Sequence, residues 1–232
     1  MTPDGQVSPL VSVIMAAYNA EAHIRDALET VVAQDWSPLE VVVVDDGSQD
    51  ATPDIVQSFP SVRYIRQDNA GPSTARNAAL AAAQGELIAV FDSDDLMATG
   101  RLRAQAEYLF SNPEVGAVLG RQEWLNPPDW LPRDAVYGDL DGIPVGGAAM
   151  FRARVIRDLG GYDTSFTHGE DTDLLIRMRE HGIPYVVLPE VVLYRRFREG
   201  SLTAQRPDQT SLLKSLRAKL ERDQVDAEAE AP

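Results

Sequence analysis

Acidic side chains gather at two places where an apolar run of the sequence ends. The run Val41–Val44 is followed by Asp45 and Asp46, and the run Leu87–Phe91 is followed by Asp92–Asp95. Carboxylates repel one another and resist leaving water, so each cluster indicates either a positively charged partner or a water-filled cleft. The simpler alternative is that both clusters are turns, in which aspartate is common.

Asp92 and Asp94 form the best candidate for a metal site. In an extended segment, residues i and i+2 lie on the same side, so two carboxylates there could bind one hard divalent cation, directly or through water. Mg²⁺ and Mn²⁺ prefer such oxygen ligands and commonly bridge to phosphate oxygens. Aspartates at this spacing are common, however, and most such pairs belong to turns or helix caps. The three histidines show no metal-ligand spacing.

Two other charged segments open predicted helices. Arg76 lies in the segment Gly71–Asn77, where a helix N-terminus favours anions and the arginine could reach a base or a phosphate. Glu170 and Asp171 begin another predicted helix. One of these carboxylates could act as a general base, although acidic residues favour that end of a helix without any function.

The densest positive cluster of this acidic chain comprises Arg195, Arg196 and Arg198. It could neutralise a leaving diphosphate, and the alternative is an exposed basic turn.

The composition limits the class of protein. The 232 residues are 44% hydrophobic, enough for one large domain or two small ones, and they carry a formal net charge of −15. Charge of that sign opposes nonspecific binding to nucleic acid or anionic lipid. The chain has no cysteine, no apolar run that approaches a membrane helix and no signal-peptide pattern at its N-terminus. We therefore expect a cytoplasmic protein, with peripheral docking at the inner membrane face as the other option.

The segments that would position these side chains alternate in type through the first half of the chain. Strands are predicted within residues 11–17, 39–48, 61–67 and 87–97, and helices within 19–34, 51–59 and 71–85, with Asn19 and Thr52 as the first two N-caps. This order predicts a mostly parallel sheet with helices on both faces. Ligands of such sheets bind beyond the carboxyl ends of the strands, where both acidic clusters lie.

The second half is less regular. Residues 121–144 are rich in Pro, Gly and Trp and are expected to form long loops, which are often functional. A strand entering a helix is expected within 145–163, a helix within 169–182 and a broken strand within 184–200. From about Pro207 a surface helix and a frayed acidic end are expected.

Seven segments occur in the order seen in the family 2 glycosyltransferases, which the chain resembles from about Val11 to Thr203. They are VSVIMAAYN, VVVVDDGSQDAT, NAGPSTARNAAL, GELIAVFDSDD, GGAAMFRARVIRDLGGYD, GEDTDLLIRM and LYRRF. The resemblance implies the GT-A fold, a single α/β domain with a Rossmann-like, mostly parallel central sheet flanked by helices. It implies an N-terminal tail (1–9), a GT-A domain (10–205) and a C-terminal helix with an acidic tail (206–232). Within the domain, residues 10–98 would bind the nucleotide sugar and residues 99–205 the acceptor.

The resemblance also implies a reaction. It is the inverting, metal-dependent transfer of a sugar from a nucleotide-diphosphate sugar to an acceptor hydroxyl, with Mn²⁺ or Mg²⁺ as the cofactor. A UDP-sugar is the expected donor, because UDP is the commonest nucleotide in the family. The acceptor would be a saccharide, a lipid-linked or another hydroxyl compound of cell-envelope polysaccharide biosynthesis. No nucleic acid partner is expected, and the oligomeric state stays open.

The resemblance assigns donor-binding roles by position. Tyr18 and Asp46 match the residues that hold the nucleotide base, with Arg76 close by. Asp92 and Asp94 match the Asp-x-Asp pair that contacts the ribose and the metal. The cation would offset the negative charge that the leaving nucleoside diphosphate gains.

The remaining roles concern catalysis and the acceptor. Asp171 matches the catalytic base, which would take the proton of the attacking hydroxyl, and Glu170 lies beside it. Arg195 and Arg196 match the basic segment near the diphosphate. The small residues that match the floor of the acceptor site are Gly146 and Gly147. Trp124, Trp130 and Tyr137 could stack on a sugar face, although tryptophan in a Pro-rich loop more often packs the loop down.

One position departs from the family pattern. Many relatives carry histidine soon after the Tyr-Arg pair, where this chain has Phe197, so no imidazole could help to hold metal or diphosphate there. Either the arginines compensate, or the chain is a catalytically weak nucleotide-sugar-binding subunit that acts with a partner. A nucleotidyltransferase of related fold would need a glycine-rich loop with a basic residue early in the chain, which AAYNAEAHI does not supply.

Overall fold

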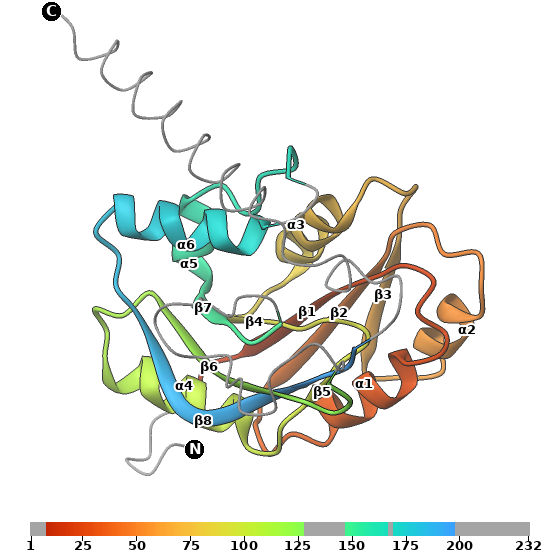
Figure 1. Ribbon diagram of the computed structural model, residues 1–232, viewed down its shortest axis with the longest axis horizontal. Helices are drawn as coiled ribbons and strands as arrows, with labels where there is room; N and C mark the ends of the chain where they lie inside the picture. Colours follow the sequence, from red (N-terminus) through yellow and green to blue (C-terminus); the bar gives the residue numbers. More distant parts are fainter. Residues whose placement is uncertain (1–7, 128–146, 167–168, 198–232) are drawn as a thin grey trace, which may run out of the picture.

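Apolar runs in the first half of the chain form parallel strands at the centre of the computed structural model, which describes residues 8–127, 147–166 and 169–197 (Figure 1). The strands are β1 (Val11–Ala17), β2 (Leu39–Asp45), β3 (Val62–Arg66) and β4 (Leu87–Val90). β1 pairs in parallel with both β2 and β4, and β2 pairs in parallel with β3. The central residues of β1, β2 and β4 are buried, which explains why these runs are apolar without alternation.

The second half of the chain extends the same sheet in mixed directions. Its strands are β5 (Leu96–Met97), β6 (Ala117–Trp124), β7 (Met150–Arg152) and β8 (Tyr185–Arg195). Across the described residues the strand order is β3-β2-β1-β4-β7-β6-β8-β5. β7 is antiparallel to β4 and β6, whereas β8 is parallel to β6, with register shifts around Arg121 that match the predicted broken strand.

Helices cover both faces of the sheet, as predicted. The helices α1 (Ile24–Val32), α2 (Thr52–Gln57) and α4 (Arg101–Ser111) pack against one hydrophobic cluster. The other cluster is covered by α3 (Pro72–Ala82), α5 (Ala153–Asp158) and α6 (Glu170–Glu180). Figure 1 shows α3, α5 and α6 together on one side and α1 and α4 on the other. Successive residues of β1, such as Ile14 and Met15, enter different clusters, so one strand contributes to both cores. The predicted Rossmann-like α/β fold is confirmed.

Some local predictions were wrong. Asn19 has a positive φ of 46° in the loop before α1, whose N-cap is His23. α2 begins at Thr52 itself, with Ala51 at the N-cap position. Residues 121–124 continue β6 and are not a loop. No sequence pattern had indicated α4.

Several predictions fall outside the described residues. They concern most of the N-terminal tail, the C-terminal segment 206–232, most of the predicted loop 121–144 with Trp130 and Tyr137, and the residues Gly146 and Arg198. The domain boundaries therefore stay predictions. Of the helices within the described ranges, none is both long enough and apolar enough to span a membrane.

Candidate active site

The two acidic clusters lie at the same edge of the sheet. β1 runs between β2 and β4, so Asp46 and Asp92 flank its carboxyl end. This arrangement follows from the parallel strand order, since parallel strands end at a common edge.

Asp46 holds the loop that leads into α3. Its carboxylate is 3% exposed and accepts hydrogen bonds from the Gln67 amide (2.7 Å) and from the backbone N–H groups of Ala70 (2.9 Å) and Gly71 (2.9 Å). Three of the roughly four acceptor positions of the carboxylate are therefore in use. Tyr18 follows β1 at the same edge and is 50% exposed. The predicted contact of Tyr18 and Asp46 with a nucleotide base stays a prediction.

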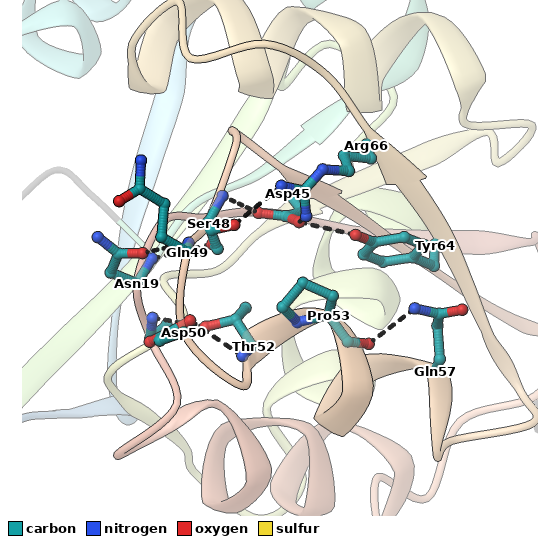
Figure 2. Close-up of polar contacts among 11 residues, drawn as sticks. Asn19, Asp45, Ser48, Gln49, Asp50, Thr52, Pro53, Gln57, Tyr64 and Arg66 are labelled. Carbon is teal, nitrogen blue, oxygen red and sulfur yellow. Dashed lines mark hydrogen bonds and ion pairs between the residues drawn. The ribbon is translucent and has the colours of Figure 1, made fainter.

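Asp45 is a buried anion with its own partners. It accepts hydrogen bonds from the Tyr64 hydroxyl (2.7 Å), Arg66 (2.8 Å) and the Ser48 backbone N–H (2.8 Å), as Figure 2 shows. Burial acts to raise the pKa of Asp45, but these hydrogen bonds and the charge of Arg66 outweigh it, so the pKa is lowered. Asp45 thus stabilises the turn after β2, and the roles of Tyr64 and Arg66 had no signal in the local sequence.

The loops after β1 and β2 are tied to each other beside Tyr18. Asn19 accepts a hydrogen bond from the Gln49 backbone N–H (2.8 Å), and its own N–H donates to the Ser48 hydroxyl (2.9 Å) (Figure 2). Gly47 has the positive φ (82°) expected of this turn. These contacts fix the backbone next to the exposed Tyr18 ring.

Arg76 lies at the centre of a second group of charges. Its guanidinium donates to Asp92 Oδ1 (2.8 Å) and to Glu170 Oε1, and it lies 5.6 Å from the ring centre of Tyr162. Burial acts to lower the pKa of Arg76, but the charges of Asp92, Asp171 and Glu170 raise it well above its ordinary value. Arg76 is therefore a permanent cation that binds carboxylates from the segment after β4 and from α6.

Asp171 is the carboxyl of this group that is suited to proton transfer. Its side chain is half-buried, and burial together with the charges of Glu170 and Asp92 raises its pKa to about 7, against the opposing effects of Arg76 and Tyr162. The Tyr162 hydroxyl is buried, with no hydrogen bond of normal geometry in the described chain, yet it lies near enough to lower this pKa. A group with a pKa near 7 can accept and release protons at neutral pH.

Buried hydrogen bonds hold α6 and Tyr162 in place. Arg177 pairs with Asp173 (2.7 Å) one turn earlier in α6 and donates to the carbonyl of Gly161 (2.7 Å). Asn77 of α3 bonds both the backbone N–H (2.8 Å) and the carbonyl (2.7 Å) of Tyr162. Gly161 must be glycine here, because it has a φ of 74° and a Cβ would come 2.5 Å from the Asn77 side-chain oxygen.

The segment after β4 is a turn, so the extended geometry predicted for Asp92 and Asp94 is wrong. Ser93 and Asp94 form the turn, and the Asp95 N–H approaches the Asp92 carbonyl at 3.5 Å. The alternation of a strand does not apply to such a backbone. Its effect is to bring three carboxylates close together: burial and the charges of Asp92 and Asp94 raise the pKa of Asp95 to about 8.

Gly147 and Arg101 lie next to the segment that leads into the acidic turn. Gly147 donates its N–H to Asp92 Oδ2 (3.2 Å), and a Cβ on Gly147 would lie 2.9 Å from the Asp92 nitrogen. Arg101, at the start of α4, is fully buried and donates to the carbonyls of Val90 (2.9 Å), Gly147 and Ala149 (3.3 Å). Burial lowers the pKa of Arg101 to about 9, although nearby carboxylates oppose this.

The basic segment at the end of β8 reaches the same turn. The Arg196 backbone N–H donates to Asp95 (2.9 Å), and its side chain donates to the Asp94 carbonyl (3.1 Å). The guanidinium of Arg195 lies 5.1 Å from the ring centre of Trp124 in β6. The predicted basic cluster thus faces the predicted acidic cluster, although Arg198 lies outside the described residues.

Comparison with known proteins identifies the family. A sequence model described as Glycosyl transferase family 2 matches residues 12–160, more than half of the chain. The chain belongs to glycosyltransferase family 2.

Two relatives within this group come from bacterial polysaccharide pathways by name. The succinoglycan biosynthesis protein ExoO of Rhizobium meliloti (strain 1021) is 49% identical over 218 residues, which cover 84% of this chain and 63% of that protein. The putative teichuronic acid biosynthesis glycosyltransferase TuaG of Bacillus subtilis (strain 168) is 39% identical over 132 residues, covering 54% of this chain and 51% of that protein. The chain therefore spans less than two thirds of either relative.

Solved structures share the fold. The S. aureus TarS fragment 1-349 in complex with UDP-GlcNAc matches with a TM-score of 0.72 and 25% identity over 82% of this chain and 59% of that one. The mannosyltransferase PcManGT of Pyrobaculum calidifontis, in complex with GDP-Man and Mn²⁺, matches with a TM-score of 0.70 and 27% identity over 87% and 61%.

This family 2 glycosyltransferase arranges its predicted site residues in three groups around one sheet edge. Tyr18 and Asp46 lie beyond β1 and β2. Arg76, Asp92, Glu170 and Asp171 form the central charge cluster. Asp94, Arg195 and Arg196 lie around the acidic turn. The structure brings Arg76 into contact with the central cluster and not with the first group. The groups are held in place by residues to which the sequence had assigned no role, above all Tyr162, Asn77 and Arg101.

Proposed function

We propose that this chain transfers a sugar from a nucleotide-diphosphate sugar to an acceptor hydroxyl, with inversion at the anomeric carbon. The observation that supports this most is the environment of the Asp171 carboxyl. It is half-buried beside Arg76 and has a pKa near 7. Glu170 and Asp92 are both bonded to Arg76, so Asp171 is the carboxyl best placed to receive a proton. Within the described ranges, Glu170 and Asp92 are held by Arg76 and only Asp171 is assigned as a base, and this favours a single displacement, which inverts the sugar.

In this reaction the acceptor oxygen forms a bond to the anomeric carbon as its proton passes to a carboxylate oxygen of Asp171. The bond from that carbon to the donor phosphate oxygen breaks, and the nucleoside diphosphate leaves with the electron pair. Arg195 and Arg196 supply positive charge beside the departing diphosphate. A bound divalent cation would offset the same developing charge.

Asp92 and Asp94 are the residues we propose for Mn²⁺ or Mg²⁺. Three carboxylates crowd into this turn and repel one another, as the raised pKa of Asp95 indicates, and a cation would relieve that repulsion. Among the residues that the structure describes, no three acidic or histidine side chains make a complete site, so phosphate oxygens of the donor would have to complete it. Asp92 also accepts bonds from Arg76 and Gly147, so a cation would share this carboxylate with them.

The relatives support the classes of substrate. TarS was solved with UDP-GlcNAc and PcManGT with GDP-Man and Mn²⁺, and we propose a UDP-sugar donor, with a GDP-sugar as the alternative. The names of ExoO and TuaG support a saccharide or lipid-linked acceptor of cell-envelope polysaccharide synthesis. We place the reaction in the cytoplasm or at the inner membrane face.

Donor turnover tests the proposal. Hydrolysis of UDP- and GDP-sugars should be measured with Mn²⁺ for the wild type, Asp171→Asn and the control Asp158→Asn, which changes an exposed carboxyl on α5. Loss of the base should lower turnover about a hundredfold or more and leave nucleotide binding intact, whereas the control should turn over normally. Equal rates in wild type and Asp171→Asn would remove Asp171 from its role. Nucleotide-sugar binding without wild-type turnover would favour the binding-subunit alternative. NMR analysis of the transfer product tests inversion.

A further inference from the structure

Phe197, the residue that departs from the family pattern, belongs to an aromatic cluster at the ends of β6 and β8. Its ring centre lies 6.4 Å from that of Trp124, with the rings inclined by 61°, an edge-to-face contact. On the same Trp124 ring lies the guanidinium of Arg195, at 5.1 Å. Tryptophan is the aromatic side chain that attracts a cation most strongly, so this ring is a suitable support for the arginine.

Backbone contacts fix this cluster. Trp124 and Arg195 are partners in the register of β6 and β8, and the Leu125 N–H donates to the Arg195 carbonyl (2.8 Å). The Asn126 side chain bonds both the backbone N–H (2.9 Å) and the carbonyl (2.9 Å) of Phe197. These two bonds fix the backbone of Phe197 next to the end of β6.

The supported arginine lies close to the acidic turn. Its neighbour Tyr194 pairs with Leu96, the first residue of β5 after the turn, in the register of β5 and β8. The next residue, Arg196, bonds directly to Asp95 and to the Asp94 carbonyl. Arg195 is therefore held between the aromatic cluster and the place proposed for the metal and the diphosphate.

We propose that Trp124 and Phe197 are positioning residues that hold the Arg195 guanidinium toward the diphosphate of the nucleotide-sugar donor. A guanidinium stacked on a ring keeps its N–H groups directed outward in its own plane, the arrangement that binds phosphate oxygens in pairs. The contact with Phe197 limits the motion of the Trp124 ring that carries the cation. In this arrangement Arg195 compensates for the histidine that many relatives carry at the position of Phe197. This inference rests on the proposed function.

Calorimetric titration with nucleotides tests the proposal. UDP and UMP, and also GDP and GMP, should be titrated in Mn²⁺ into the wild type, Trp124→Leu and Phe197→Leu. Because only the diphosphates carry the second phosphate, their affinity should fall roughly tenfold in both variants, the loss expected for one misplaced charge-assisted contact. Monophosphate affinity should change less than about twofold. A purely structural role would weaken both ligands alike.

Two further variants sharpen the test. Phe59→Leu removes another ring that carries an arginine, since Arg25 lies 5.9 Å from it, and this control should leave the ratio of diphosphate to monophosphate affinity unchanged. Trp124→Phe keeps a ring under Arg195 and should restore most of the affinity that Trp124→Leu loses. Circular dichroism melting checks folding; if Trp124→Leu fails to fold, Phe197→Leu and Trp124→Phe remain to be compared with the wild type.

The outcomes distinguish a failure of this inference from a failure of the proposed glycosyltransferase function. If the wild type binds nucleotides but the affinity ratio is the same in Phe197→Leu as in the wild type, the inference is overturned and the proposed function stands. If the wild type binds no nucleotide at all, the proposed function fails, and the inference fails with it.

Discussion

Replacing Asp171 by asparagine should stabilise the folded chain at alkaline pH while it removes activity. The pKa of this carboxyl rises from 3.8 to about 7 on folding because of burial and the nearby charges of Glu170 and Asp92. At about 1.4 kcal/mol for each pKa unit, ionising Asp171 in the folded chain costs at most about 4 kcal/mol. Since the side chain is half-buried and partly reached by water, we expect a gain of about 1–3 kcal/mol in the free energy of unfolding.

The sign of the pH dependence follows from proton binding. Below pH 3.8 the carboxyl is protonated in both folded and unfolded chains and contributes no difference. Between 3.8 and about 7 the unfolded chain releases the proton while the folded chain keeps it, so the wild type loses stability as the pH rises. Above about pH 7 the loss is complete. Asparagine does not ionise, so the advantage of Asp171→Asn should grow across this window and then level off.

Urea unfolding at several pH values, in metal-free buffer, measures this difference directly. The exposed carboxyl variant Asp158→Asn is the matched control, and its offset from the wild type should be nearly the same at every pH. A gap between Asp171→Asn and wild type that stays flat from pH 4.5 to 8.5 would refute the reasoning. So would a wild type that is the more stable protein at pH 8.5.

Other predictions concern activity, packing and the cation. The kcat/KM of the wild type should fall about tenfold for each pH unit below about 7, because protonated Asp171 cannot accept a proton. Initial rates between pH 5.5 and 8.5 measure this, and a kcat/KM that does not change below pH 7 would contradict it. Gly161→Ala should lower the free energy of unfolding by about 2–4 kcal/mol, because its Cβ would meet the Asn77 oxygen at 2.5 Å and its φ is positive; an unchanged urea midpoint would show that α3 can move aside. Asp94→Ala should abolish the part of nucleotide affinity that depends on Mn²⁺, as should a chelator with the wild type, and titration of UDP with and without Mn²⁺ tests this; a metal-dependent gain equal to that of wild type would rule Asp94 out as a ligand.

The first half of the fold could be predicted because its strands are buried on both faces. Runs such as Val41–Val44 are apolar at every position for that reason. The second half offered weaker patterns. β6 ends in polar residues beside the site, including the buried Gln122, and so resembles a loop from residue 121 onward. α4 begins with the buried Arg101, which breaks the expected match between apolar residues and the core.

The candidate site, like the fold, could be predicted only in part. The strand pattern placed Asp46 and Asp92 at one sheet edge, and the family resemblance assigned Asp171 and Arg195 roles in the same site. The contacts that arrange them join segments far apart in the chain, such as Arg76 with Glu170, and no local pattern encodes such pairs. A turn at Asp92–Asp95 had stood only as the alternative to an extended segment, because an apolar run gives no sign of where its extended backbone stops.

Arg101 has a consequence for anyone who would recombine members of this family. Its side chain donates hydrogen bonds from α4 to the carbonyls at the end of β4 and to those before β7. In a chimaera with a crossover between residues 98 and 101, the arginine would come from one parent and the end of β4 from the other. If the ends of the strands differed between the two parents, the buried guanidinium of Arg101 would lose its hydrogen-bond acceptors. Libraries of chimaeras should keep residues 87–101 and 147–149 from a single parent, and junctions in surface loops away from this arginine should yield the larger share of folded progeny.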